Sequence, residues 1–169
     1  LIGDFVELLQ ATISKKGTFL TVADEFHILN NYVHLQEFRY QGSFRVRYEM
    51  EEGAGGCYIP RLILQPLVEN AILHGIDMKE KNGEIILRAK LEPDRLRLFV
   101  IDNGRGMTKE QIDTLLHSKT KKTNGLSAIG VPNIKERLEL YYGDKGGMVY
   151  QSSENGTTVE IFLPAKKEL

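Results

Sequence analysis

Three polar side chains interrupt a stretch that is otherwise almost entirely apolar, L62-I-L-Q-P-L-V-E-N-A-I-L-H-G75. They are Glu69, Asn70 and His74, and the last two stand four residues apart, so on a helix they share one face. A buried carboxamide or imidazole costs stability unless it finds partners. These side chains therefore either bind a polar ligand or cap and bridge neighbouring backbone, and the segment alone leaves both alternatives open.

A carboxylate stands at the end of the most hydrophobic predicted strand, in I101-D-N-G-R-G-M107. Asp102 is followed by Gly104 and Gly106, which permit a ligand to approach the backbone closely. Taken in isolation, an ordinary Asp-Asn-Gly turn explains these residues better.

The third segment is a glycine-bearing loop that runs into a predicted helix, G125-L-S-A-I-G-V-P-N-I-K-E-R-L138. A helix N-terminus offers free backbone N–H groups and the positive end of the helix dipole, which together hold phosphate. The pattern is weak alone, since many helices begin after glycine.

The elements that must position these segments follow from the spacing of apolar residues. Helical spacing predicts helices over residues 4–15, 22–40 and 131–142, and another that has Pro60 in its first turn and continues to Ile72. Alternation predicts strands over residues 44–50, 85–91, 96–101, 148–152 and 157–163, with a turn at 92–94. A capping box from Thr108 to Gln111 opens a short helix, and the polar, basic stretch 118–127 is predicted to be a mobile loop.

The helix predicted over residues 22–40 carries two apolar stripes. Such a pattern indicates burial on two sides, as in a helix that docks on a domain and also meets a partner. The stripes consist of Val22, Phe26, Leu29 and Val33, and of Ile28, Tyr32 and Leu35.

Hairpin-linked strands mixed with helices predict an α+β fold, a sandwich in which helices cover one face of a sheet. The 169 residues suit one domain, or one domain with a helical extension, and 41% of them are hydrophobic, as in soluble globular proteins. A formal net charge of −1 gives no push toward nucleic acid or an anionic membrane. No apolar run approaches the ~20 residues needed to cross a bilayer.

The three segments together, in this order and at these spacings, resemble the N, G1 and G2 boxes of the Bergerat ATP-binding fold. Histidine kinases, gyrase B-type ATPases, Hsp90 and MutL share that fold. The similarity is greatest to sensor histidine kinases of the LytS/YesM type and covers roughly residues 20 to 164. It is carried by L29-N-N-Y-V-H-L-Q-E-F-R-Y40, I59-P-R-L-I-L-Q-P-L-V-E-N-A-I-L-H-G75, D102-N-G-R-G-M107, I129-G-V-P-N-I-K-E-R-L-E-L-Y-Y-G143 and N155-G-T-T-V-E-I-F-L-P164.

The resemblance implies a two-layer α/β sandwich with a mixed, mostly antiparallel sheet, and two parts. Residues 1–40 would be the later part of a helical dimerisation hairpin, and residues 41–169 the ATP-binding catalytic domain. The sequence begins at Leu1 without Met, inside a predicted helix, so we expect it to be part of a longer protein.

The resemblance also implies where ATP and Mg²⁺ bind. At the phosphate end, Asn70 would coordinate Mg²⁺ through its amide oxygen, His74 would lie near the phosphates or ribose, and Glu69 would orient the metal's water or act as a base. Backbone amides at Gly130 and Val131 would contact the triphosphate. The loop 118–127 would be the ATP lid. Its side chains Lys119, Lys121 and Lys122 would either pair with phosphate oxygens or simply be solvated, and the sequence leaves both alternatives open.

At the base end, Asp102 would accept a hydrogen bond from the exocyclic amine of adenine, which selects adenine over guanine. Gly104 and Gly106 would leave room for the base, Met107 would pack on it, and Thr157 or Thr158 would close the pocket from the sheet.

Four positions depart from the family pattern: Pro66, Leu73, Ala128 and Val131. Ala128 replaces the first glycine of the lid motif, and Val131 replaces a usual leucine. Pro66 and Leu73 are common variations in this subfamily. None of the four removes an essential ligand.

The phosphoacceptor of this subfamily lies in a P-H-F-x-x-N pattern, and none of the four histidines fits it: His27, His34, His74 or His117. We therefore expect the acceptor upstream of Leu1, and we expect this chain to bind ATP without phosphorylating itself. The resemblance further implies the cytoplasmic domain of a membrane-anchored, homodimeric bacterial receptor. Its partner would be the receiver domain of a response regulator, whose aspartate takes the phosphoryl group, and no nucleic acid is expected.

Two other functions remain in view. Another ATPase of the superfamily would place a catalytic glutamate four residues before the metal asparagine, but that position is Pro66, which argues against hydrolysis. A degenerate module that only senses nucleotide or dimerises is the other possibility, and Ala128 is its sole motivation.

Overall fold

The computed structural model describes residues 2–3, 18–117 and 130–169. A five-stranded sheet dominates the described chain, in the order β2-β4-β5-β7-β6. Its strands are β2 (Phe44–Met50), β4 (Gly83–Leu91), β5 (Arg95–Asp102), β6 (Gly147–Ser153) and β7 (Gly156–Pro164). Only β2 and β4 pair in parallel, so the sheet is mixed and mostly antiparallel.

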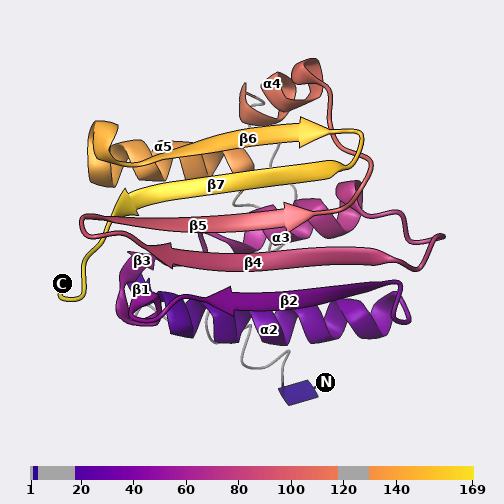
Figure 1. Cartoon of the computed structure of the whole chain (residues 1–169), viewed down its shortest axis with the longest axis horizontal. Coiled ribbons are helices and arrows are strands. Elements are labelled where there is room, and N and C mark those ends of the chain that lie inside the picture. The colour runs from indigo at the N-terminus through magenta and orange to yellow at the C-terminus, as the bar shows by residue number, and fades with distance from the viewer. Residues whose placement is uncertain (1, 4–17, 118–129) are drawn as a thin grey trace.

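Helices cover one face of this sheet (Figure 1). They are α2 (Val22–Arg39), α3 (Gln65–Asn70), which continues into a π-helical turn (Ala71–Gly75), α4 (Lys109–His117) and α5 (Val131–Tyr142). A small separate sheet joins β1 (Phe19–Thr21) to β3 (Tyr58–Pro60). Within the described ranges this is the α+β sandwich that the sequence predicts.

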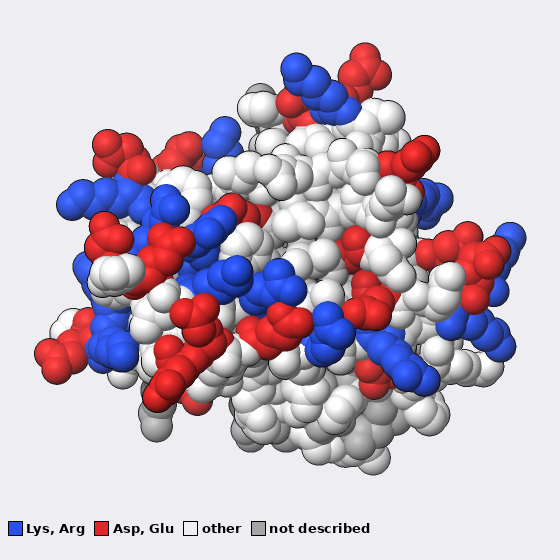
Figure 2. Space-filling model, viewed as in Figure 1, with Lys and Arg blue, Asp and Glu red and all other residues white. Residues whose placement is uncertain are grey.

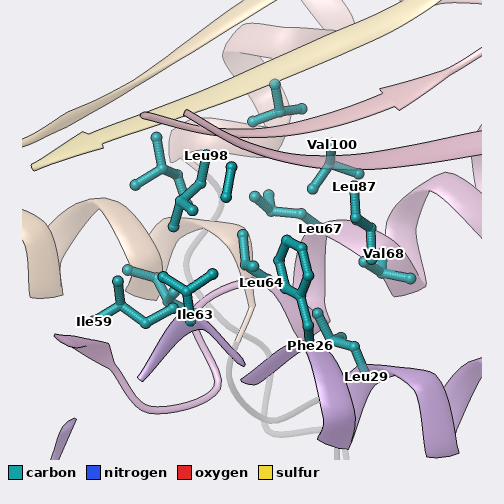
Figure 3. Packing of buried hydrophobic residues seen from close by; sticks show 14 of the residues in the cluster. Phe26, Leu29, Ile59, Ile63, Leu64, Leu67, Val68, Leu87, Leu98 and Val100 are labelled. Atoms are coloured by element: carbon teal, nitrogen blue, oxygen red, sulfur yellow. The ribbon is translucent and has the colours of Figure 1, made fainter. Parts of the chain in front are cut away.

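The hydrophobic core lies between the sheet and its helices, and Figure 3 shows side chains from both layers meeting there. The inward residues of the strands alternate, as in β5, where Leu96, Leu98 and Val100 are buried and their neighbours are not. Phe26 and Leu29 of α2 belong to the same buried cluster as the sheet residues. Helix α2 is thus packed into the core of the domain; the predicted boundary at residue 40 stays a prediction.

The opposite face of the sheet is open and covered with charged side chains of both signs (Figure 2). Arg88 of β4 pairs with Glu49 of β2, and Arg97 of β5 pairs with Glu160 of β7 and Glu92. The sheet therefore has one dry face and one wet face, which explains the clean alternation of its strands.

The predicted strands and most of the predicted helices are confirmed, with ends that differ by one or two residues. Both stripes of α2 are largely buried within this chain, including Ile28 and Tyr32 of the second stripe. The predicted capping box exists: the Thr108 amide donates to Gln111 Oε1 at 2.9 Å, and the Gln111 amide donates to Thr108 Oγ1 at 3.1 Å. The helix predicted over residues 4–15 and the loop 118–127 lie outside the described residues.

The prediction for Pro60 is wrong. This proline ends β3, and the helix begins five residues later at Gln65, with Pro66 in its first turn. Between them Leu62 takes a left-handed backbone conformation with φ of 56°, which no helix can contain. Pro60 and Pro66 are both suited to a first helical turn. Because the helix cannot run through Leu62, it begins after that residue, and Pro66 is the proline in its first turn.

Among the described residues, no helix is both long enough and apolar enough to span a membrane. The thiol of Cys57 is fully buried beside the short turn Ala54–Gly56, and burial raises its pKa. A buried thiol with a raised pKa carries little reactive thiolate.

Candidate functional site

A cavity of about 640 Å³ opens where α3, its π-helical turn and α4 meet the ends of β5, β6 and β7. Its size is in the range of small-molecule sites. It is lined by Leu67, Asn70, Ala71, His74, Gly75, Val100, Asp102, Arg105, Gly106, Met107, Glu110, Gln111, Thr114, Leu115, Tyr150, Thr157 and Val159.

Asp102 is the buried carboxylate of this cavity, with 8% of its surface exposed. It is the last residue of β5, between Ile85 of β4 and Thr157 of β7 in the sheet register. Its Oδ1 accepts a hydrogen bond from the amide of Gly104 at 2.9 Å. Burial raises the pKa of the carboxyl, and hydrogen bonds from the amides of Gly104 and Thr157 oppose that rise. The carboxylate is thus held in place while it faces the cavity.

The polar residues of the first segment reach the cavity from α3 and the turn that follows it. Asn70 ends the α-helix, and His74 lies in the π-helical turn, a feature often found at functional sites. His74 is exposed and Asn70 half-buried. No described residue forms a hydrogen bond with either side chain, so the alternative that they cap or bridge backbone finds no support among the described contacts.

The loop after β5 docks directly on this turn. The backbone amide and Nε of Arg105 donate to the carbonyl oxygens of Gly75 and His74, both at 3.1 Å. A Cβ on Gly104 would lie 1.9 Å from the Gly75 carbonyl oxygen, so only glycine permits this approach. The first two sequence segments therefore meet through backbone contacts, and Asp102 and Asn70 line one cavity.

A hydroxyl pair ties the same loop to the far strands. Ser152 Oγ of β6 accepts from the Met107 amide at 2.7 Å and lies 2.8 Å from Thr157 Oγ1 of β7. Gly106 has a φ of 75°, and a Cβ there would lie 1.8 Å from the carbonyl oxygen of Ser153. The backbone of the second segment is thus fixed on both sides, by α3 and by β6.

Glu69 does not line the cavity. It accepts a hydrogen bond from Gln65 Nε2, one turn earlier in α3, at 3.2 Å. Burial raises its pKa, and its charge contributes to the raised pKa of Tyr32 in α2. The side chain therefore faces the interface of α2 and α3, and its predicted role as a base stays a prediction that this placement does not favour.

Six of the predicted site residues line the cavity together: Asn70, His74, Asp102, Gly106, Met107 and Thr157. Thr158 occupies the opposite face of β7, because neighbouring strand residues point to opposite sides. Gly104 serves the backbone approach described above, and Gly130 and Val131 begin α5 without lining the cavity. The predicted lid residues Lys119, Lys121 and Lys122, and Ala128, lie outside the described residues.

Several lining residues were not predicted. Arg105 stands inside the recognised D-N-G-R-G segment, and Glu110, Gln111, Thr114 and Leu115 belong to the helix that the capping box announces, so both had a sequence signal. Tyr150 and the supporting Ser152 had none, since they read as ordinary inward residues of a strand.

A fully buried carboxylate lies where α2, the segment before α3 and α5 meet. Glu25 of α2 accepts hydrogen bonds from the amides of Leu62 and Leu64, at 3.1 and 3.3 Å, just before α3. Arg137 of α5 donates to the carbonyl oxygen of Arg61 at 2.7 Å in the same corner. Burial raises the pKa of Glu25 to about 7, against the lowering effect of those amides and of Arg137. This corner fixes how α2 and α5 sit against the start of α3.

Comparison with known proteins gives a family for this arrangement. The model of the family described as histidine kinase-, DNA gyrase B-, and HSP90-like ATPase matches residues 59–167. The chain is 31% identical over 151 residues to the sensor protein LytS of Staphylococcus epidermidis, covering 89% of this chain and 25% of that protein. It is 29% identical over 163 residues to the sensor histidine kinase YesM of Bacillus subtilis, covering 96% and 27%. The chain thus spans about a quarter of the length of these curated relatives.

Solved structures show the same fold. The catalytic domain of histidine kinase ThkA has a TM-score of 0.66 at 17% identity, with 89% of this chain and 96% of that one covered. ThkA in complex with the response regulator protein TrrA gives a TM-score of 0.62 at 16% identity, covering 98% and 47%.

Proposed function

Because the chain belongs to the histidine kinase-, DNA gyrase B-, and HSP90-like ATPase family, we propose that it binds Mg²⁺-ATP in the cavity between Asn70 and Asp102. We further propose that it acts as the catalytic domain of a sensor histidine kinase. The observation that carries the proposal is that two polar segments, 32 residues apart from Asn70 to Asp102, line one cavity of nucleotide size.

The base end follows from hydrogen-bond chemistry. The buried carboxylate of Asp102 is an acceptor that lines the cavity, where it takes the exocyclic amine of adenine. Guanine places a carbonyl oxygen at that position, and two facing acceptors repel. Met107 packs on the base, Thr157 closes the pocket from β7, and Gly106 leaves the backbone room.

The phosphate end rests on Asn70 and His74. An amide oxygen suits a hard cation such as Mg²⁺, and the carboxamide of Asn70 is half-buried at the cavity with no partner among the described residues. A bound Mg²⁺ would neutralise charge on the phosphate oxygens. Further phosphate contacts are proposed for His74, for the backbone at Gly130 and Val131, and for Lys119, Lys121 and Lys122. Glu69 is proposed to orient the metal's water or to act as a base, although it does not line the cavity.

The proposed reaction is phosphoryl transfer by positioning and charge neutralisation. The bond from the γ-phosphorus to the β–γ bridging oxygen breaks, a bond from phosphorus to an imidazole nitrogen forms, and ADP leaves. In the second transfer the phosphorus–nitrogen bond breaks and a bond to an aspartate carboxylate oxygen of a response regulator forms. The acceptor histidine is proposed to lie outside this chain.

The partners are proposals of the same kind. The solved complex of ThkA with the response regulator protein TrrA supports the proposal that this chain's partner is the receiver domain of a response regulator. Similarity to LytS and YesM supports a sensor protein. We propose that this chain belongs to its cytoplasmic part, that the full-length protein forms a homodimer through the helical hairpin, and that upstream segments anchor it in the membrane.

Calorimetric titration with a non-hydrolysable ATP analogue tests the proposal. We expect binding that strengthens with Mg²⁺, that weakens about tenfold to a hundredfold in Asp102→Asn, and that loses its Mg²⁺ dependence in Asn70→Ala. The matched control is Asp94→Asn, an exposed aspartate just before the other end of β5, which should bind like the wild type. Wild-type affinity in both site variants would show that the site is assigned wrongly.

A further inference from the structure

Tyr150 belongs to the wall of the cavity, but the proposed contacts to ATP leave it without a role. It lies on β6 opposite Val159 of β7, and both residues line the cavity together with Asp102. Its neighbour two positions on, Ser152, holds the loop that carries Met107, so this face of β6 is directed at the base end.

The hydroxyl of Tyr150 is buried and forms no hydrogen bond with any described residue. Buried hydroxyls are usually paired, so an unpaired one in a cavity wall indicates a partner that the cavity would receive. Burial and the negative charge of Asp102 both raise the pKa of this phenol, so it stays protonated and available as a donor. An acceptor and a donor thus stand near one another at the base end.

Adenine presents the complementary pair. Its exocyclic amine donates, and the ring nitrogens on either side of that amine accept. Guanine reverses the pair on its base-pairing edge, where a carbonyl oxygen accepts and the ring nitrogen carries a hydrogen. On the basis of the proposed function, we propose that the Tyr150 hydroxyl donates to the ring nitrogen beside the amine on the base-pairing edge of adenine, directly or through one water. Tyr150 is then a second determinant of base specificity, next to Asp102.

An unpaired hydroxyl alone does not carry this proposal, because Tyr48 has one too. Tyr48 packs its ring on Phe26 of α2 and does not line the cavity. The two tyrosines share a buried hydroxyl without a described partner and differ in whether the residue lines the cavity. Tyr48→Phe is therefore the matched control for Tyr150→Phe.

The test compares these two variants on the whole chain, with non-hydrolysable analogues of ATP, 1-deaza-ATP and 7-deaza-ATP. We expect Tyr150→Phe to weaken the ATP analogue about tenfold, and Tyr48→Phe to leave it unchanged. The 1-deaza analogue should bind the wild type about tenfold more weakly and be insensitive to Tyr150→Phe, whereas the 7-deaza analogue should respond to Tyr150→Phe as the ATP analogue does. The urea midpoint of Tyr150→Phe should not fall, because the lost hydroxyl has no partner among the residues that the structure describes.

Two outcomes would overturn the inference: equal affinity of Tyr150→Phe and wild type for the ATP analogue, or an equal loss for all three analogues. The second would mean that the hydroxyl supports the pocket without touching a ring nitrogen. Both differ from failure of the proposed function, in which the wild type does not bind, or Asp102→Asn binds as the wild type does.

Discussion

At the scale of residues, the site depends on a few backbone approaches that no side chain permits. Gly104 lets the loop after β5 lie against Gly75, and Gly106 takes a left-handed conformation against Ser153. In sequence these glycines look like turn residues, yet each is fixed by a contact with a distant element. Their identity is therefore a requirement of the site.

The substitution Gly104→Ala tests this requirement. Its Cβ would lie 1.9 Å from the Gly75 carbonyl oxygen, so the loop must move away from the π-helical turn. We expect the free energy of unfolding to fall by about 2 to 3 kcal/mol and affinity for the ATP analogue to fall with it. Urea unfolding and titration measure the two effects.

Gly56→Ala is the control, since a Cβ at Gly56 meets nothing within 4 Å. Unchanged stability and binding in Gly104→Ala would mean that the contact with Gly75 is not needed.

At the scale of elements, α2, α3 and α5 are joined by one buried acid. The Glu25 carboxylate faces the amides of Leu62, Ile63 and Leu64 and the guanidinium of Arg137, and burial still raises its pKa from 4.5 to about 7. Between these two pH values the unfolded chain releases a proton that the folded chain keeps. The resulting stability is fully present below pH 4.5 and is lost as the pH rises through about 7.

We expect this group alone to remove about 3 kcal/mol from the free energy of unfolding as the pH rises from 4.5 to 8. The substitution Glu25→Gln should abolish that part of the slope, because the amide does not titrate. Urea unfolding at several pH values measures it. The exposed Glu52→Gln serves as the control and should keep the wild-type slope, whereas an unchanged slope in Glu25→Gln would contradict the shifted pKa.

The helices and strands also differ in how well the sequence predicts them. Alternation found all five strands of the main sheet, and the capping box found α4, because these signals are local. Strands β1 and β3 have three residues each, too few for a period, and they pair across nearly 40 residues of chain. Pro60 and Pro66 both suit a first helical turn, and only the reversal at Leu62 separates them.

The residues of the site likewise include some that the sequence predicts and some that it does not. Asn70 and Asp102 were predicted because each is a polar exception in an apolar setting, and the family resemblance supplied their pairing. Tyr150 and Ser152 were not predicted, because their importance depends on the register of β6 with β7 and on the loop that docks there. Contacts that exist only after strands pair leave no mark at a single position.

At the scale of the whole molecule, the two faces of the sheet contribute unequally to stability. The covered face buries Leu87, Leu98 and Ile161 almost completely. The open face carries ion pairs such as Arg97 with Glu160, whose side chains are 29% and 20% exposed. Water screens charges of this kind, so most of the stabilisation comes from the covered face.

Two substitutions compare the faces. Leu98→Ala should lower the free energy of unfolding by about 3 kcal/mol, because it leaves a cavity in the core. Glu160→Gln keeps the side-chain shape and should cost less than about 1 kcal/mol, with the cost shrinking as salt is added. Urea unfolding at low and high salt gives both values. A larger loss in Glu160→Gln than in Leu98→Ala would contradict this division.

The docking of Arg105 on the carbonyl groups of His74 and Gly75 has a consequence for how a ligand is received. The residues at the two ends of the cavity are held in register by folding, so binding need not order them against each other. The entropy that association usually loses in aligning separate recognition groups is thereby reduced on this side of the cavity. It also means that the distance between the phosphate end at Asn70 and the base end at Asp102 is fixed and selects ligands by length. A ligand whose polar ends match that span is received without rearrangement, and a shorter or longer one meets only one end.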